Sequence, residues 1–381
     1  MNFELTDEQK LIQKTAKDLA KDHIEMGAIE RDEKKIWPKE IIQEMSSLGF
    51  MGMMVSQDYN GGGMDTVSYT IAMEEISKAD ASVGVIMSVN NSLVCYLLEK
   101  FASEELKQKY LKPLASGKKL GAFSLSEPQS GSDASNMRTL AIRNGNHYIL
   151  NGTKNWVTNG ISSDYVIIFV VTEKDVGHKG ISCFLVEKGW DGFETGKPED
   201  KLGIRSSDTC ELYFNNVKVP LENRIGAEGM GFKIAMATLD GGRIGIASQA
   251  LGIAQSAMEK SISYSKERKQ FGKPIASNQA IQNKLADMSI TIESARLLIR
   301  KAAWAKDNGK EFGQLASQAK VYASEIALEA AIQCVQIYGG NGYMREYGVE
   351  RLMRDAKITQ LYEGTSEIQR MVIGRKLLQK N

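Results

Sequence analysis

The first third of the chain places apolar residues at the spacing of helices. Thr6 can cap a helix, with Gln9 reaching back from three residues later, and Ile12, Ala16 and Leu19 then recur near the helical period. Glycines and prolines separate the further helices that the pattern predicts, over residues 41–48, 69–78, 83–98 and 104–114. Residues 1–118 are therefore predicted to form an N-terminal helical domain.

A period of two replaces the helical period in the middle of the chain. Short runs rich in β-branched and aromatic residues, bounded by turn-forming pairs such as Asn-Gly, predict strands over residues 147–151, 165–171, 181–186 and 210–214. No helical segment of ~10 to 15 residues separates these runs, which disfavours a doubly wound parallel sheet. We expect residues 119–231 to form a middle β-barrel-like domain.

Helical periodicity returns after Gly231. Long helices are predicted over residues 232–266, 279–307, 313–338 and 350–378, and Ile281, Leu285 and Met288 mark an apolar face on the second. Short connections between long helices are typical of an antiparallel bundle. Residues 232–381 are therefore predicted to form a four-helix bundle, and the fold class is α+β, mostly α.

Composition and charge limit the possible functions of the protein more than its possible folds. The 381 residues include 48 Lys and Arg and 47 Asp and Glu, a formal net charge of +1, so no strong field is available to hold nucleic acid. The longest apolar runs, such as residues 165–171, stop short of the ~20 residues of a membrane span. The N-terminus lacks the character of a targeting peptide, so we expect no membrane association, and a location in the bacterial cytoplasm or, for a mature chain, the mitochondrial matrix.

Several common chemistries find no support in the sequence. The four cysteines form neither a CxxC pair nor a disulfide framework, so free and mostly buried thiols are expected. The three histidines form no HExxH motif or cluster, which argues against a histidine metal site and a serine–histidine triad. No GxGxxG occurs, and Gly117 to Lys119 lacks the glycine spacing of a P-loop. We expect no metal and neither of these nucleotide-binding motifs.

The first of three notable polar segments runs from Phe123 to Asp133. Ser126, Ser130 and Gly131 supply hydroxyls and backbone N–H groups that could cradle a phosphate or the polar edge of a ring. A plain surface turn would have the same composition, so this segment alone leaves both interpretations open.

The second polar segment runs from Asn151 to Gly160. Trp156 and Thr158 alternate on a predicted strand and so face the same way, which would present an aromatic plane beside a hydroxyl. An aromatic core residue next to a hairpin turn is the alternative.

The third polar segment runs from Leu361 to Arg370. Gly364 interrupts a helical pattern there and would permit the close approach of a ligand. A carboxylate at Glu363, desolvated beside Tyr362, would tend toward the raised pKa of a general base. A solvated glutamate at a helix end is the alternative.

Together these segments resemble the acyl-CoA dehydrogenase family, in the right order and over essentially the whole chain, with the short-chain (butyryl-CoA) branch as the most similar. The resemblance implies FAD as the cofactor, with flavin contacts from the first two segments at Phe123, Leu125, Ser126, Gly131, Ser132, Trp156, Val157 and Thr158. It implies further flavin contacts directly after the base at Thr365, Ser366 and Glu367. Ser132 would also lie near the CoA part of the substrate.

The bundle carries two more segments that resemble the family. SKERKQFGKPI is similar to its Arg-x-x-Phe-Gly signature, which implies that Arg268 contacts the flavin diphosphate and that Phe271 and Gln279 are further cofactor neighbours. QIYGGNGY is similar to the loop that binds the cofactor of a neighbouring subunit, here with contacts from Gln336, Ile337, Gly339 and Gly340. The resemblance therefore implies an oligomer, usually a homotetramer.

The family has two positions for its catalytic base. One lies in the YEGT segment and the other in a segment that reads LDGGR here, where the matching residue is Gly242. The resemblance therefore leaves Glu363 as the catalytic residue. It places the substrate near Ser132, Gly364 and the run Asp240, Gly241, Gly242 and Arg243, with Arg243 in a structural or CoA-proximal role.

The resemblance implies oxidation of a short-chain acyl-CoA to a trans-2-enoyl-CoA. Glu363 would take the α-proton, the β-hydrogen would pass as hydride to flavin N5, and the electrons would leave to an electron-transferring flavoprotein. The alternatives are an enoyl-CoA reductase in an electron-bifurcating complex, an oxygen-using acyl-CoA oxidase and a non-enzymatic family member.

Overall fold

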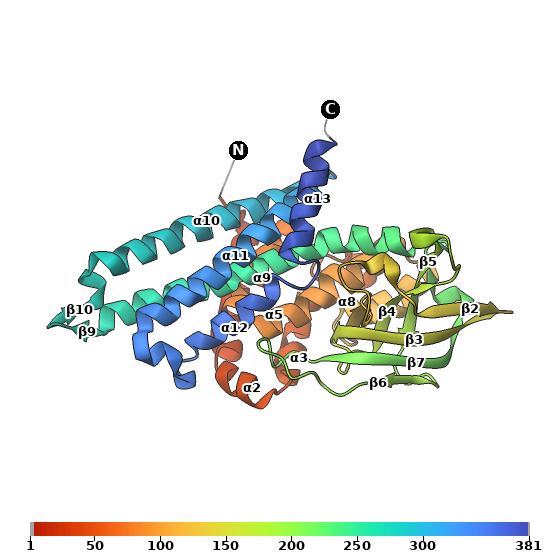
Figure 1. The fold of residues 1–381 in the computed structure, drawn as a ribbon, viewed down its shortest axis with the longest axis horizontal. Coiled ribbons are helices and arrows are strands. Elements are labelled where there is room, and N and C mark those ends of the chain that lie inside the picture. Colours follow the sequence, from red (N-terminus) through yellow and green to blue (C-terminus); the bar gives the residue numbers. More distant parts are fainter. Residues whose placement is uncertain (1–3, 380–381) are drawn as a thin grey trace.

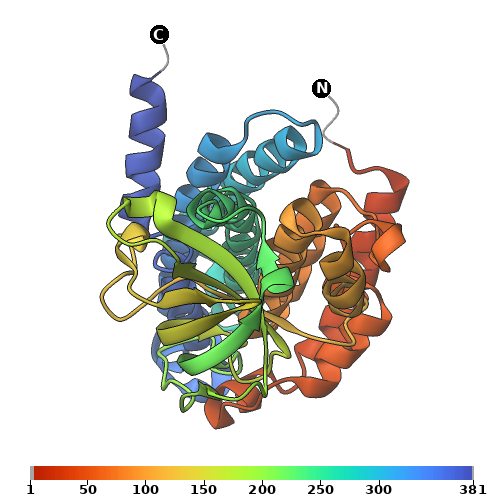
Figure 2. The ribbon, with the colours of Figure 1, turned by 90° about the vertical axis from the view of Figure 1, so that its right-hand side faces the viewer.

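The computed structural model describes residues 4–379, and three parts follow one another along the chain. Helices come first, a β-sheet follows, and long helices complete the molecule. The sheet lies at one end of the molecule and the small β9–β10 hairpin lies at the opposite end, with the long helix α9 running between them (Figure 1). Seen from the sheet end, the helices of the first and last parts stand behind the sheet (Figure 2). The fold class and the order of the three parts agree with the prediction.

The N-terminal part is built from short helices. They are α1 (Asp7–Leu19), α2 (Ala28–Lys34), α3 (Lys39–Ser47), α4 (Thr66–Ala79), α5 (Ala81–Ser88), α6 (Tyr96–Phe101), α7 (Glu104–Leu106) and α8 (Lys112–Ala115). The expected cap of α1 is present, because Thr6 Oγ1 accepts from Gln9 N at 3.2 Å and Thr6 N donates to Gln9 Oε1 at 3.1 Å.

Among the described residues, one helical stretch, Ala81–Phe101, is long and apolar enough to cross a membrane. It joins α5 and α6 through π-helical turns at Val89–Cys95. The expectation that no segment reaches the length of a span is wrong for this stretch. Its apolar window is 94% buried inside the protein, which is the packing of a core helix.

The middle part is a mixed, mainly antiparallel sheet. Its strands are β1 (Gly121–Ser124), β2 (Leu140–Asn144), β3 (His147–Thr158), β4 (Tyr165–Val171), β5 (Ile181–Glu187), β6 (Phe193–Thr195), β7 (Thr209–Pro220) and β8 (Arg224–Ile225). The order is β6-β7-β3-β2-β4-β5-β8, with β1 paired to β4. Only the pairs β1–β4 and β2–β4 are parallel. β3 and β7 are much longer than predicted because they continue through bulges that interrupt the alternation.

The C-terminal part consists of α9 (Gly231–Glu267), the hairpin β9 (Lys269–Gln270) and β10 (Lys273–Pro274), α10 (Gln279–Asp307), α11 (Gly313–Tyr338), α12 (Val349–Thr359) and α13 (Ser366–Leu378). The first three long helices agree with the prediction. The fourth, expected over residues 350–378, is wrong as one helix: α12 ends at Thr359, and Thr365 caps a separate α13 by accepting from Ile368 N at 3.3 Å. The break carries Glu363 and Gly364.

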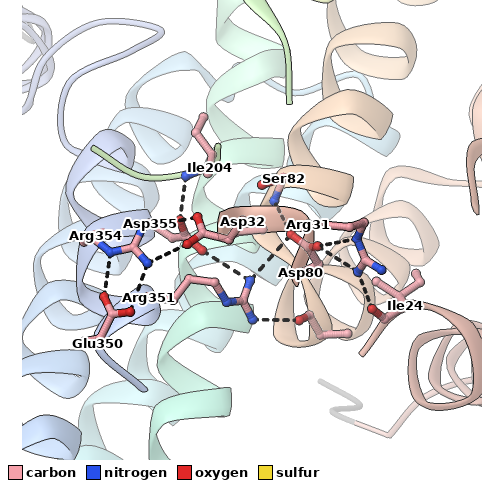
Figure 3. A network of polar contacts seen from close by, with 12 residues as sticks. Ile24, Arg31, Asp32, Asp80, Ser82, Ile204, Glu350, Arg351, Arg354 and Asp355 are labelled. Carbon is pink, nitrogen blue, oxygen red and sulfur yellow. Dashed lines mark hydrogen bonds and ion pairs between the residues drawn. The ribbon is translucent and has the colours of Figure 1, made fainter. Parts of the chain in front are cut away.

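A buried polar network ties the helical parts to the loop between β6 and β7 of the sheet (Figure 3). Asp80 pairs with Arg31 at 2.9 Å and lies 3.6 Å from Arg351, which in turn pairs with Asp355 at 3.4 Å. Asp355 accepts a hydrogen bond from Ile204 N at 2.5 Å. All of the charged members are buried, so each needs its partners. The network fixes α12, and with it the start of the Glu363 turn, against the other two parts.

Candidate active site

The turn between α12 and α13 holds two consecutive residues with positive φ. Glu363 has φ 52° and Gly364 has φ 93°. A non-glycine residue in this region costs ~1 kcal/mol or more, so the surroundings must stabilise it. The φ of Gly364 favours glycine, and a Cβ there would also overlap with Gln369 Nε2 and displace that side chain. The sequence places a glutamate on a bend that the chain does not form easily.

The Glu363 carboxylate is enclosed. Its Oε2 is buried, and among the described residues it has no hydrogen-bond partner. Burial raises the pKa of Glu363 to about 7, and the nearby positive charges of Lys320 and Arg243 oppose this rise. These features do not fit a solvated glutamate at a helix end. They describe a carboxylate with a free lone pair that can exchange a proton near neutral pH.

Gly242 on α9 faces this carboxylate. A Cβ on Gly242 would overlap with Glu363 Oε2 and would lie 2.7 Å from Leu93 Cδ2. Of the predicted substrate residues, Gly242 and Gly364 therefore lie at Glu363. The two positions predicted as alternatives for the base, Gly242 and Glu363, thus lie against each other, with Leu93 of the N-terminal part beside them.

Asp240 and Arg243 lie close by on α9. The buried Arg243 guanidinium pairs with Asp240. Asp240 also borders a hollow of about 220 Å³ that Lys310, Phe312 and Lys376 help to line. Gly241 faces a different way, toward Lys306 Nζ at 3.6 Å from a built Cβ. The run predicted to contact substrate thus lies beside both the Glu363 carboxylate and an adjacent hollow.

Two residues that hold the turn were missed by sequence reasoning. Lys320 on α11 donates to Gly364 O at 2.6 Å, and Gln369 donates to Glu363 O at 3.2 Å and to Gly364 O at 3.1 Å. A signal for Lys320 was present, because it lies on the same buried helix face as Ala316 and Ala323. A lysine among alanines on a buried face indicates a specific partner.

The structure brings the first two polar segments together. Asn155 N donates to Ser126 O at 2.9 Å, and Lys154 Nζ donates to Leu125 O at 3.1 Å and pairs with Glu127 at 2.8 Å. The Lys154–Glu127 pair is buried, and burial lowers the pKa of Lys154 to about 8. A turn is present around Pro128, but a buried ion pair holds it, so a plain surface turn is not an adequate description.

Trp156 lies on the rim of the sheet with its side chain 61% exposed. Its φ of 58° coincides with a bulge between Lys154 and Val157. Val157 is buried and Thr158 is half-buried, so the indole and the hydroxyl face away from the sheet core. The alternative of an aromatic core residue is wrong. An exposed indole on a bent strand offers a flat surface for an aromatic ring.

The remaining predicted cofactor residues fall into two places. Thr365, Ser366 and Glu367 open α13, and Ser366 Oγ is buried without a partner among residues 4–379. Arg268, Phe271 and Gln279 and the loop 336–343 lie together at the far end of α9, where Tyr264 and Tyr338 stack at 3.9 Å. That end is the opposite end of the molecule from the sheet (Figure 1). One chain therefore does not bring all of these residues together.

Comparisons with known proteins agree with this architecture. Three family models match in order: the acyl-CoA dehydrogenase N-terminal domain over residues 6–118, the middle domain over 122–217 and the C-terminal domain over 229–378. The chain is 48% identical to a short-chain-specific acyl-CoA dehydrogenase of Clostridium acetobutylicum over 377 residues, covering 99% of this chain and 100% of the relative.

Two solved structures share the whole fold. One is butyryl-CoA dehydrogenase from Megasphaera elsdenii, with a TM-score of 0.98 and 49% identity over 100% of both chains. The other is a chain from a structure described as electron transferring flavoprotein of Acidaminococcus fermentans, towards a mechanism of flavin-based electron bifurcation, with a TM-score of 0.99 and 47% identity over 100% of both chains. The chain belongs to the acyl-CoA dehydrogenase family of FAD-dependent oxidoreductases. Its similarity to short-chain members, predicted from the sequence, is confirmed.

Proposed function

We propose that this enzyme oxidises a short-chain acyl-CoA to the trans-2-enoyl-CoA, with Glu363 as the base that removes the α-proton. One observation carries the proposal: a buried carboxylate oxygen without a partner among the described residues, on a group whose pKa burial raises to about 7. The α-proton of a thioester is weakly acidic, so a base needs both a raised pKa and exclusion of water.

The backbone of the turn can assist the same step. Within residues 4–379, the Glu363 N–H donates to no acceptor, although it lies in a tightly held turn. An oriented N–H of this kind can donate to the thioester carbonyl oxygen, where negative charge develops as the α-proton leaves. Glu363 would then supply both the base and one of the stabilising hydrogen bonds.

The residues of these segments fit FAD. An exposed indole at Trp156, the joined segments around Ser126 and the unpartnered Ser366 Oγ offer stacking and polar contacts of the kind a flavin needs. When bound, FAD supplies the acceptor for the β-hydrogen. Arg268, Phe271, Gln279 and the loop 336–343 would reach the cofactor of a neighbouring copy, because they lie at the opposite end of their own chain. This arrangement supports an oligomer, which we propose to be a homotetramer.

The electron acceptor is proposed to be an electron-transferring flavoprotein. A second direction of reaction has a specific observation in its favour, since a neighbour with a TM-score of 0.99 comes from work described in terms of electron bifurcation. In that setting the enzyme would reduce an enoyl-CoA. Mixing the protein with crotonyl-CoA and a reduced electron-transferring flavoprotein, and following acyl-CoA formation, distinguishes the two directions.

The test of the base is an anaerobic titration with butyryl-CoA, following flavin absorbance. Wild type is expected to bleach and Glu363→Gln is expected to retain flavin without bleaching. Glu222→Gln, the same change at an exposed glutamate outside the site, serves as the control and should bleach like wild type. Equal bleaching in Glu363→Gln and wild type would overturn the assignment, and a flavin-loaded wild type that never bleaches would overturn the substrate class.

A further inference from the structure

Lys320 is buried on α11 with 1% of its surface exposed. Burying an ammonium group costs several kcal/mol unless it finds good partners. Its Nζ donates to Gly364 O at 2.6 Å, directly after Glu363. Among the described residues, no carboxylate forms an ion pair with Lys320. The contact that offsets its burial is therefore made to the turn that carries the base.

A second buried donor completes the support. Gln369 donates to the carbonyl oxygens of both Glu363 and Gly364, at 3.2 and 3.1 Å. Two consecutive carbonyls of the turn thus point to buried side chains. Because φ of Glu363 is 52°, this conformation is unfavourable without such contacts. Of the two donors, Lys320 alone also brings a charge.

Lys320 has no direct ion pair within residues 4–379, and the Glu363 carboxylate is the main negative charge that acts on it. Arg243, the other cation that acts on Glu363, is paired with Asp240. Lys320 is the larger of the two positive influences on Glu363, and burial lowers the pKa of Lys320 itself to about 8. The field at the carboxylate therefore depends on the protonation of Lys320.

We propose that Lys320 is a positioning residue for the dehydrogenation: its ammonium group holds the Gly364 carbonyl, and thereby the Glu363 turn, and its charge keeps the Glu363 carboxylate ionised near neutral pH. This inference rests on the proposed role of Glu363. It separates into two parts, a hydrogen bond that fixes geometry and a charge that sets the pH range of activity.

The two parts are separated by substitution. Lys320→Gln keeps a donor and removes the charge, Lys320→Met removes both, and Lys320→Arg keeps both. The measurement is the anaerobic rate of flavin reduction by saturating butyryl-CoA from pH 5.5 to 9, in flavin-loaded enzyme. In wild type the rate should rise with pH through about 7, where Glu363 loses its proton.

For Lys320→Gln we expect this rise to move to higher pH by ~1 unit, so that the variant is about fivefold slower at pH 7 and converges with wild type at pH 9. Lys320→Met should be slower at every pH because the turn is also released. Lys320→Arg should keep the rise at or below its wild-type position. Lys306→Gln is the matched control, because burial lowers the pKa of Lys306 to about 8 as well. Lys306 contacts Tyr96 and Met54 instead of the turn. The pH at which the rate of flavin reduction rises should therefore not change in this variant.

A flavin-loaded Lys320→Gln whose rate rises at the wild-type pH would overturn the inference. If that variant does not bind flavin, Lys320→Arg decides, because a rise displaced to higher pH despite the retained charge would equally overturn it. These results differ from failure of the proposed function, which would show as an unreduced wild type or a fully active Glu363→Gln.

Discussion

Gly242 lies against the carboxylate of Glu363, so that a β-carbon at position 242 would overlap with Oε2. The two residues are far apart in the sequence, on α9 and on the turn after α12. Their contact gives a physical reason for the two base positions in the family. A carboxylate could reach this space from position 242 on α9 or from position 363 on the turn. With Glu363 in place, even a methyl group at position 242 would overlap with it.

Gly242→Ala should therefore impair catalysis without unfolding the protein. The new methyl group would displace the Glu363 carboxylate or Leu93, and we expect flavin reduction by butyryl-CoA to slow by ~100-fold, in line with small misplacements of a catalytic group. Gly374→Ala is the control, because Gly374 lies on α13 outside the predicted site residues and its Cβ would meet nothing within 4 Å. It should be slightly stabilising in the helix and retain activity. Equal rates in the two variants would contradict the prediction.

The pattern of apolar residues was enough to predict the order of the three parts and the first three long helices of the bundle. It failed at the turn, where Glu363 takes a positive φ that tertiary contacts impose from Lys320 and Gln369. At Trp156 the pattern left two interpretations open, and a bulge that it does not predict turns the indole outward. Both departures from a regular pattern occur at the candidate site, where long-range contacts override local preference.

Stability should depend on pH through Glu363. Its pKa is about 7 in the folded protein and 4.5 when unperturbed, so between these values the unfolded chain releases a proton that the folded protein keeps. Stability therefore falls as pH rises from 4.5 to 7, by about 3 kcal/mol in total. Glu363→Gln removes this cost, so its melting temperature should exceed that of wild type at pH 8, by ~4 °C at most, and should match it near pH 4.5.

Flavin-free protein is the form to measure, because cofactor binding would add its own contribution to stability. Glu222→Gln supplies the control for the substitution itself, since this glutamate is exposed. A difference between Glu363→Gln and wild type that stays constant from pH 4.5 to 8 would show that the carboxylate does not carry the raised pKa.

Trp156 should affect cofactor retention more than folding. Its positive φ suits glycine, so Trp156→Gly relieves backbone strain, and the exposed indole contributes little to the core. We expect an unchanged or slightly higher melting temperature of flavin-free protein and a ~10-fold weaker affinity for FAD, from the loss of aromatic contact. Fluorescence titration with FAD measures the affinity. Trp304→Ala, at another exposed tryptophan, is the control and should bind FAD like wild type. If Trp156→Gly were destabilised but kept the wild-type affinity for FAD, the role of Trp156 would be structural instead.

Losing one member of the buried pair Lys154–Glu127 should cost more stability than losing both charges. Lys154→Met leaves the Glu127 carboxylate buried without a counter-charge, although Arg138 N, Thr139 N and Gln129 Nε2 still donate to it at 2.6, 3.0 and 2.8 Å. This change should destabilise the protein by about 3 to 5 kcal/mol. Adding Glu127→Gln removes the unpaired charge and should restore most of that loss.

Because the pair joins the two segments proposed to hold FAD, flavin content after purification should fall in the single variant and recover in the double variant. Lys119→Met, which breaks the exposed 2.8 Å pair with Asp164, should cost less than ~1 kcal/mol and leave flavin content unchanged. If the double variant were as unstable as Lys154→Met, the loss would come from the packing of the lysine and its hydrogen bond to Leu125 O. In that case these contacts, and not the ion pair, would join the two segments.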